Sequence, residues 1–256
     1  MPAKIRLLST DFDGTLVSHA NDPVFDRDCM ELIRELQFGG AIWAINTGRS
    51  VGLLEEGLED FAFPLQPDFI LTSERDVFRP TERGWEPYGD WNARCAQAHA
   101  ELYAATSSVL AEVVDYVTRQ TEARVIYEAD EPAGLIASSE EEMDRLTDFI
   151  DQAKAGEPKF HYQRNTVYLR FCHADYHKGA ALEELSRLTE IPHSAIFAAG
   201  DHHNDISMLD GRYAALPACP ANAIPAVKEA VRRADGWVAE KEFGAGVHEA
   251  LQHFLS

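Results

Sequence analysis

Leu7-Leu8-Ser9-Thr10-Asp11-Phe12-Asp13-Gly14-Thr15-Leu16-Val17 is an apolar run interrupted by two aspartates that stand one residue apart. Such a run is typical of a buried strand, and the Asp-Gly pair is typical of a turn. Two carboxylates at the end of a buried strand need a positive partner. Because two like charges raise each other's proton affinity, one carboxylate suits nucleophilic attack and the other suits carrying a proton. Taken alone, the stretch also fits an Asx-turn that ends a strand.

The composition restricts the class of protein. A chain of 256 residues that is 45% hydrophobic can bury the core of one large domain or two. The formal net charge of -20 and the lack of a Lys/Arg cluster argue against a nucleic-acid partner and against binding to anionic lipid. We expect neither partner.

The N-terminal sequence and the cysteines bear on location. The first eight residues lack the apolar centre of a signal peptide, and no stretch approaches the roughly 20 apolar residues of a membrane helix. Cys29, Cys95, Cys172 and Cys219 are scattered and match no zinc spacing, so we interpret them as buried thiols in a reducing compartment. We expect a cytoplasmic protein.

Buried-strand runs alternate with helical periodicity at both ends of the chain. Ala41 to Ile45 and Phe69 to Thr72 are such runs, and Asp26 can cap the helix before the first of them. The same pattern returns after residue 178. There we expect helices at 179–189, 223–234 and 246–255, and strands at 195–199, 213–216 and 237–238. This alternation predicts an α/β fold with a Rossmann-like, doubly wound parallel sheet.

The middle of the chain follows another pattern. We expect a hairpin at 76–88, a long helical region at 92–120, strands at 124–127 and 134–137, a helix at 140–154 and strands at 159–163 and 167–172. Helix, two strands, helix, two strands (αββαββ) is an antiparallel α+β unit. We therefore predict a core of residues 1–82 and 173–256 with an inserted α+β cap of residues 83–172.

Polar side chains gather where the predicted parallel strands end. They are Asp11 with Asp13, Thr47 with Gly48, and Asp201 with Asn204 and Asp205, while Lys178 opens a helix of the same layer. Ligands of open α/β sheets bind at this edge. Four carboxylates there require a cation, and oxygen ligands favour Mg²⁺. Because threonine, glycine amide and lysine are phosphate ligands by type, the pattern predicts a site for phosphoryl transfer.

Each element of this pattern has a simpler interpretation. Thr47-Gly48-Arg49 also fits a strand-to-helix turn, and Lys178 alone fits a solvated surface lysine. Asp201 with Asn204 and Asp205 also fits a cluster that caps the helix beginning at Ile206.

Four stretches in this order resemble the four motifs of the haloacid dehalogenase (HAD) superfamily. They are Asp11-Phe-Asp-Gly-Thr15, Thr47-Gly-Arg49, Lys178-Gly179 and Gly200-Asp-His-His-Asn-Asp205. The insert between the second and third motifs is similar to the large cap of the Cof-type branch, which includes sucrose-phosphate phosphatases. For the cap, the resemblance depends on position and on element order alone.

The resemblance implies a role for each motif. Asp11 would be the nucleophile that forms an aspartyl-phosphate, and Asp13 would protonate the leaving oxygen and then activate water. Mg²⁺ would be held by Asp11, Asp201 and the backbone carbonyl of Asp13, and Asp205 would bind the metal or a water on it. The phosphate would be bound by Thr47, Gly48 and Lys178, and Asn204 would contact the phosphate or Lys178.

Substrate recognition is less well defined by the sequence. Arg164, Tyr168 and Arg170 lie where a cap hairpin could face the substrate, although a charged cap surface also accounts for them. Arg49 is a further candidate, and an acidic neighbour such as Glu74 could pair with it. Residues 71–76 depart from the Ser/Thr-Asn-Gly-Ala that relatives often have there, because Glu74 and Arg75 replace small residues.

These observations predict a magnesium-dependent phosphatase of small phosphorylated metabolites, most of all sugar phosphates, acting as a monomer or small homo-oligomer. One alternative is a phosphotransferase or mutase that passes the same aspartyl-phosphate to a second hydroxyl group. Another is a metal- and phosphate-binding module without turnover.

Overall fold

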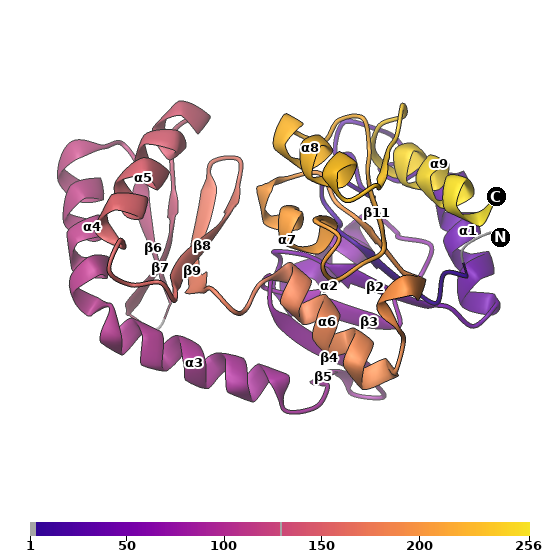
Figure 1. Cartoon of the computed structure of the whole chain (residues 1–256), viewed down its shortest axis with the longest axis horizontal. Helices are drawn as coiled ribbons and strands as arrows, with labels where there is room; N and C mark the ends of the chain where they lie inside the picture. The colour runs from indigo at the N-terminus through magenta and orange to yellow at the C-terminus, as the bar shows by residue number, and fades with distance from the viewer. Residues whose placement is uncertain (1–3, 129) are drawn as a thin grey trace. The chain divides into compact units, whose positions relative to one another are not determined.

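The structure is a computed structural model that describes residues 4–128 and 130–256 (Figure 1). The chain forms two compact units. We call the unit made by residues up to Asn92 together with Lys178–Ser256 the core unit, and residues Ala93–His177 the inserted unit. The N-terminal residues Met1–Ala3, on which part of the signal-peptide argument depends, lie outside the described residues.

The core unit contains an eight-stranded sheet in the order β12-β11-β10-β1-β2-β3-β4-β5. The strands are β1 (Leu7–Thr10), β2 (Ile42–Asn46), β3 (Phe69–Thr72), β4 (Asp76–Thr81), β5 (Gly84–Pro87), β10 (Ile196–Ala199), β11 (Leu216–Cys219) and β12 (Trp237–Val238). The pairs from β12 to β3 are parallel, and β4 and β5 add an antiparallel edge. Since β1 lies between β2 and β10, segments from both ends of the chain meet at its carboxyl end.

Helices cover both faces of this sheet. They are α1 (Arg27–Phe38), α2 (Val51–Asp60), α6 (Lys178–Thr189), α7 (Ile206–Leu209), α8 (Pro225–Arg233) and α9 (Phe243–Leu255), with short 3-10 helices η1 (His193–Ala195) and η2 (His203–Asp205). Leu8 packs into the core formed with α1, α2 and α9, and α1 lies beside α9 (Figure 1). The next residue, Ser9, points to the other face and meets Met208 of α7. The alternation along β1 explains the predicted doubly wound architecture, which is confirmed.

Local signals explain where these elements begin. The Asp26 carboxylate accepts a hydrogen bond from the Cys29 amide (2.8 Å) and caps α1, as predicted.

The strand expected at 213–216 is wrong by three residues, because β11 is Leu216–Cys219. Prolines are uncommon inside strands, so Pro217 weakens the sequence signal of β11. The structure tolerates Pro217 because pairing with β12 begins only at Ala218.

The inserted unit forms a four-stranded antiparallel sheet in the order β6-β7-β9-β8. Its elements are α3 (Trp91–Ala105, which begins in the core unit), α4 (Ser107–Gln120), β6 (Arg124–Glu128), β7 (Glu131–Ile136), α5 (Glu140–Ala153), β8 (Phe160–Asn165) and β9 (Tyr168–His173). Side chains from α4, α5 and the sheet share one apolar core. The single helical region expected at 92–120 is two helices, which meet at Thr106.

The boundaries between the units fall near the predicted ones without coinciding. The hairpin expected at 76–88 forms as β4 and β5, and it belongs to the core sheet. A boundary at residue 83 would cut this hairpin, whereas the division of contacts falls at residues 92 and 177. The assignment of 83–172 to a separate cap domain stays a prediction.

Candidate active site

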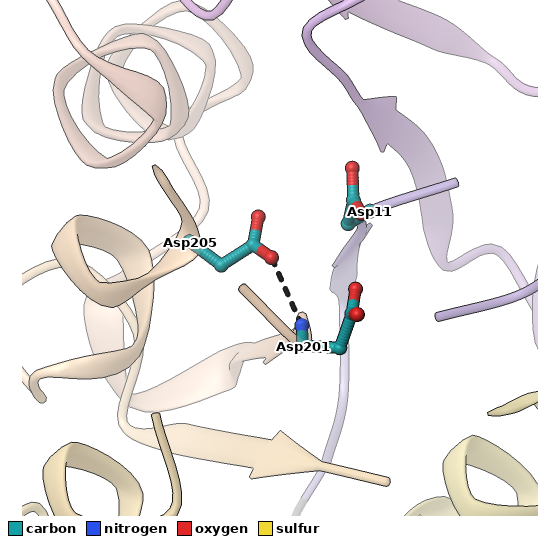
Figure 2. Close-up of side chains that lie close together, drawn as sticks. All are labelled: Asp11, Asp201 and Asp205. Atoms are coloured by element: carbon teal, nitrogen blue, oxygen red, sulfur yellow. Dashed lines mark hydrogen bonds between the residues drawn. The ribbon is translucent and has the colours of Figure 1, made fainter. Parts of the chain in front are cut away.

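Three acidic side chains converge at the carboxyl ends of β1 and β10. Asp11 follows β1, Asp201 follows β10, and Asp205 ends η2. One carboxylate oxygen from each of the three lies within 4.8 Å of the others (Figure 2). Asp11 and Asp205 are buried, and Asp201 is partly buried. The structure therefore brings together three of the four carboxylates that the sequence predicts to share a cation.

Lys178 provides the positive charge at this cluster. Its ammonium group donates to Asp11 Oδ1 (2.7 Å) and to Asp205 Oδ1 (2.6 Å) and is fully buried. The side-chain amide of Asn46 donates to the Lys178 carbonyl (3.1 Å) and so fixes the start of α6. Burial alone lowers the pKa of Lys178, but Asp11 and Asp205 raise it above its usual value. The interpretation as a solvated surface lysine is wrong, because the side chain has no exposure to solvent.

The single positive charge of Lys178 does not balance the negative charges of three carboxylates. Burial, together with the charge of Asp205, raises the pKa of Asp11 well above its usual value. The same two causes raise the pKa of Asp201 to about 7. The side chains thus form a site that favours protons or another cation. Oxygen donors held this close are the ligand set of a hard divalent ion, so the residues fit Mg²⁺.

The backbone around the acids is shaped to hold them. Amides of Asp201 and His202 both donate to Asp205 Oδ2 (2.9 Å each), and Figure 2 shows the first of these bonds. The Thr15 hydroxyl donates to Asp201 Oδ1 (2.9 Å). Gly14 has φ +80°, and a Cβ there would lie 2.5 Å from Asp201 Oδ2. Only glycine accommodates both the conformation and this contact.

The Asp13 carboxylate points to a different set of partners. It accepts from Arg49 Nε at Oδ2 and from Arg49 Nη2 at Oδ1, both at 2.7 Å, and from His19 Nε2 at Oδ1 (2.9 Å). Although burial alone raises the pKa of Asp13, the Arg49 guanidinium lowers it below the usual value. The acidic partner of Arg49 is thus Asp13, whereas Glu74 was the neighbour suggested by the sequence.

The predicted phosphate ligands lie at the ends of β2 and β10. Thr47 is buried, and its Oγ1 accepts the amide of Arg49 (3.2 Å). Asn204 donates from Nδ2 to Glu74 Oε1 (3.1 Å), while its own Oδ1 is buried without a partner among the described residues. A Cβ at Gly48 would lie 2.7 Å from Glu74 Oε1. Glu74 therefore lines the predicted phosphate site.

The three cap candidates do not share one face of their sheet. Arg164 pairs across the strands with Leu169, whose side chain is buried in the core, and it forms an ion pair with Asp144 of α5 (2.6 Å). Tyr168 and Arg170 alternate with Leu169 along β9 and so lie on the opposite face. Arg170 forms an ion pair with Glu128 (3.1 Å). Arg164 is thus held against a helix of its own unit.

Three partners of the site were not found from the sequence. Thr15 carried a signal, because it belongs to the first motif. Glu74 was noticed as a departure, but nothing linked it to Asn204, which is 130 residues away. His19 lies in a polar, proline-containing loop with no periodicity, so no pattern pointed to it.

The sequence of this chain matches a known family of proteins. The family model of the haloacid dehalogenase-like hydrolases matches residues 104–251. This match covers more than half of the chain, and the chain belongs to that family. In the residues that the structure describes, no helix has both the length and the hydrophobicity needed to cross a membrane.

One curated relative and two solved structures illustrate the likeness. Phosphoglycolate phosphatase of Methanothrix thermoacetophila is 38% identical over 76 residues, which are 30% of this chain and 32% of that protein. The match thus spans about a third of that relative. The sucrose-phosphatase of Synechocystis sp. PCC6803, solved with sucrose and phosphate, has a TM-score of 0.72 at 19% identity and 98% coverage of both chains. A HAD/COF-like hydrolase from Plasmodium vivax has a TM-score of 0.66 at 20% identity, covering 98% of this chain and 95% of the other. At these identities the two structures establish the fold, of the Cof and sucrose-phosphatase type.

Proposed function

We propose that the protein is a magnesium-dependent phosphatase that hydrolyses small phosphorylated metabolites through an aspartyl-phosphate on Asp11. One observation carries the proposal. Buried Lys178 bridges Asp11 and Asp205, and carboxylate oxygens of Asp11, Asp201 and Asp205 lie within 4.8 Å of one another at the edge of a parallel sheet where ligands bind. A buried cluster of this charge has a high energetic cost, and its position suits the binding of a cation and a phosphate.

Asp11 is the proposed nucleophile. Its carboxylate oxygen attacks phosphorus in line, an O–P bond forms, and the ester oxygen departs from the opposite side. One slow hydrolysis is thereby divided into two faster steps. Lys178, in contact with Asp11, is placed to balance the negative charge of the phosphoryl oxygens.

The proposed metal ligands are Asp11, Asp201, Asp205 and the backbone carbonyl of Asp13. The raised pKa values of Asp11 and Asp201 support a cation at this position, because a divalent ion would favour their ionised forms. When bound, Mg²⁺ would screen the repulsion between the nucleophile and the phosphate. Asp205 also orients the loop through the two amides at its Oδ2.

The phosphate is proposed to contact the Thr47 hydroxyl, the Gly48 amide, Lys178 and Asn204. Asn204 Nδ2 already donates to Glu74, so a direct contact with phosphate requires a second hydrogen from the same amide. The buried Oδ1 without a partner supports a ligand or a bound water beside Asn204.

Asp13 is the proposed proton carrier. As an acid it gives a proton to the leaving oxygen, and as a base it takes one from the water that cleaves the aspartyl-phosphate. The lowered pKa of Asp13 describes the state without substrate, in which Arg49 holds the carboxylate ionised. A phosphate beside Arg49 would compete for this guanidinium.

Sugar phosphates are the proposed substrates. Support comes from the fold that the chain shares with a sucrose-phosphatase. In the inserted unit, Tyr168 and Arg170 are the candidates for selecting the leaving group. A monomer or small homo-oligomer stays a prediction, and so does the cytoplasmic location, which is supported by four buried cysteines that form no disulfide among the described residues.

The test is a screen of phosphate esters, with and without Mg²⁺, using the wild-type chain and Asp11→Asn. We expect inorganic phosphate to be released continuously only with Mg²⁺. The substitution should lower kcat by at least about a thousandfold, because the amide is a poor nucleophile. Asp210→Asn, at an exposed position in the same unit, is the matched control.

Other results would favour the alternatives. Release of phosphate that requires an added sugar acceptor would favour a phosphotransferase or mutase. Binding of Mg²⁺ and phosphate without turnover of any ester would favour a binding module. Full activity of Asp11→Asn would contradict the assigned nucleophile.

A further inference from the structure

His19 contacts the proposed proton carrier and has no role so far. Its Nε2 lies 2.9 Å from Asp13 Oδ1. An ionised carboxylate can only accept, so the imidazole N–H is the donor. The contact joins the loop that follows the first motif to the side chain that is proposed to move the proton.

The loop presents His19 in a defined position. Ser18 donates its amide to the Val24 carbonyl (2.7 Å), and Val17 forms a bridge with Phe25. The His19 ring packs in a T-shaped arrangement with the ring of Phe61, the residue after α2, with centroids 5.4 Å apart. The backbone of His19 is therefore fixed by the closed loop, and its imidazole is positioned by the aromatic ring of Phe61.

The hydrogen bonds at Asp13 distinguish its two oxygens. Each carboxylate oxygen can accept about two hydrogen bonds. Oδ1 receives two donors, His19 Nε2 and Arg49 Nη2, whereas Oδ2 receives only Arg49 Nε among the described residues. Oδ2 therefore still has a lone pair that accepts no hydrogen bond from the described residues, and a proton on Asp13 would bind to this oxygen. Without His19, each oxygen would accept one hydrogen bond from Arg49, and the two would be equally able to bind the proton.

Stability alone accounts poorly for this contact. The side chain of His19 is 59% exposed, and hydrogen-bonded pairs at such positions add little to the stability of a fold. Arg49 is positioned by further contacts, since it donates to the Leu53 carbonyl (3.0 Å) and lies over Phe12. The contribution that only His19 makes is the choice between the oxygens of Asp13.

We propose that His19 is a positioning residue that occupies Oδ1 of Asp13 and so directs the transferred proton to Oδ2; this rests on the proposed phosphatase function. In the first step the Asp13 Oδ2–H bond breaks and the proton passes to the leaving ester oxygen. The P–O ester bond breaks as the Asp11–phosphorus bond forms, and Asp13 is left as a carboxylate. His19 keeps its own proton throughout.

The leaving group provides the test. An alkyl ester, such as a hexose phosphate, has a basic leaving oxygen that needs the proton, whereas p-nitrophenolate departs without one. We expect His19→Ala to lower the single-turnover rate with the best hexose phosphate from the screen about tenfold, a part of what general acid catalysis provides. The rate with p-nitrophenyl phosphate should stay within about twofold.

Two further variants complete the experiment. His19→Gln keeps an N–H donor and should restore most of the hexose phosphate rate. His193→Ala, which removes another exposed histidine of the core unit, should leave both rates unchanged. Equal losses on both esters, no loss on either, or a His19→Gln chain as slow as His19→Ala would overturn the proposal. Failure of the proposed function is distinguishable, because the wild-type chain would then hydrolyse neither ester.

Discussion

At the scale of residues, Glu74 is the side chain that departs most from what a phosphate site requires. It is buried, adopts φ +70°, and adds negative charge beside Lys178 and Asn204. A non-glycine residue in this backbone region carries strain, which is commonly found near functional sites. Glu74 thus opposes the binding of an anion at the proposed phosphate site.

This position gives a prediction about phosphate affinity. Glu74→Gln keeps an oxygen that can accept from Asn204 and removes one negative charge. We expect inorganic phosphate to inhibit the variant at concentrations a few-fold lower than the wild type, on the order of 1 kcal/mol in binding free energy. Inhibition constants measured with Mg²⁺ present would check this. Glu55→Gln, an exposed site on α2, is the control, and weaker inhibition by phosphate would contradict the prediction.

The site could be predicted from the sequence as far as its motifs reach. Asp11, Asp201 and Asp205 follow from the rule that parallel strands present their carboxyl ends to one edge, and Lys178 follows from its place at the start of a helix of the same layer. Arg49 has an acidic partner as expected, but that partner is Asp13 and not the suggested Glu74, because the conformation after a strand end decides which acid a long side chain meets. His19 was beyond prediction, since a loop contact depends on backbone turns that leave no periodic signal.

At the scale of elements, Glu142 joins the start of α5 to two other segments of the inserted unit. Its carboxylate accepts the Ser138 amide and hydroxyl (2.7 Å each) and the Glu122 amide (2.8 Å). These hydrogen bonds, those from Ser138 first, lower the pKa of Glu142 below its usual value. One carboxylate thus satisfies donors from before the helix and from the segment after α4.

Removal of this carboxylate should loosen the inserted unit. We expect Glu142→Ala to lower the free energy of unfolding of this unit by about 2 kcal/mol, because two backbone donors lose their acceptor. Thermal or urea unfolding would measure the change. Glu141→Ala, at the exposed neighbouring position, should change the stability by less than about 0.5 kcal/mol. Equal effects of the two substitutions would contradict this role of Glu142.

Most elements could be predicted because periodicity and burial agree. Two of the errors have local causes. Helical spacing continues across residues 92–120, so only the backbone at Thr106 reveals that the region is two helices. The threonine hydroxyl donates to the Leu102 carbonyl (2.8 Å), a local bond that competes with helix continuation. In β11, Pro217 masked a strand that its parallel neighbours stabilise.

At the scale of the whole molecule, the acidic site should link folding to pH and to Mg²⁺. The pKa of Asp201 rises from 3.8 to about 7 on folding, so the folded state binds this proton more tightly. The stabilisation is complete below about pH 4 and is lost as the pH rises through about 7. A divalent cation acts in the opposite sense, because it binds the ionised carboxylates.

We therefore expect pH and Mg²⁺ to have opposite effects on the temperature of thermal unfolding. In EDTA, the difference between the Tm of the wild type and the Tm of Asp201→Asn should decrease as the pH is raised from 5 to 8. Added Mg²⁺ should raise the Tm of the wild type more at pH 8 than at pH 5. Asp210→Asn serves as the control for a substitution outside the cluster. Parallel pH profiles of the wild type and Asp201→Asn would contradict the shifted pKa.

The central place of β1 affects how the protein is made. Its neighbour β2 leaves the ribosome soon after it, but its other neighbour, β10, is synthesised only after the whole inserted unit. A nascent chain thus exposes one bare edge of β1 until β10 has been made, while the inserted unit can already condense. During that time Asp11 lacks both Lys178 and Asp201. The acidic cluster therefore forms only after Asp205 has been synthesised, and a product that ends before Lys178 should carry Asp11, the proposed nucleophile, without the partners that it needs.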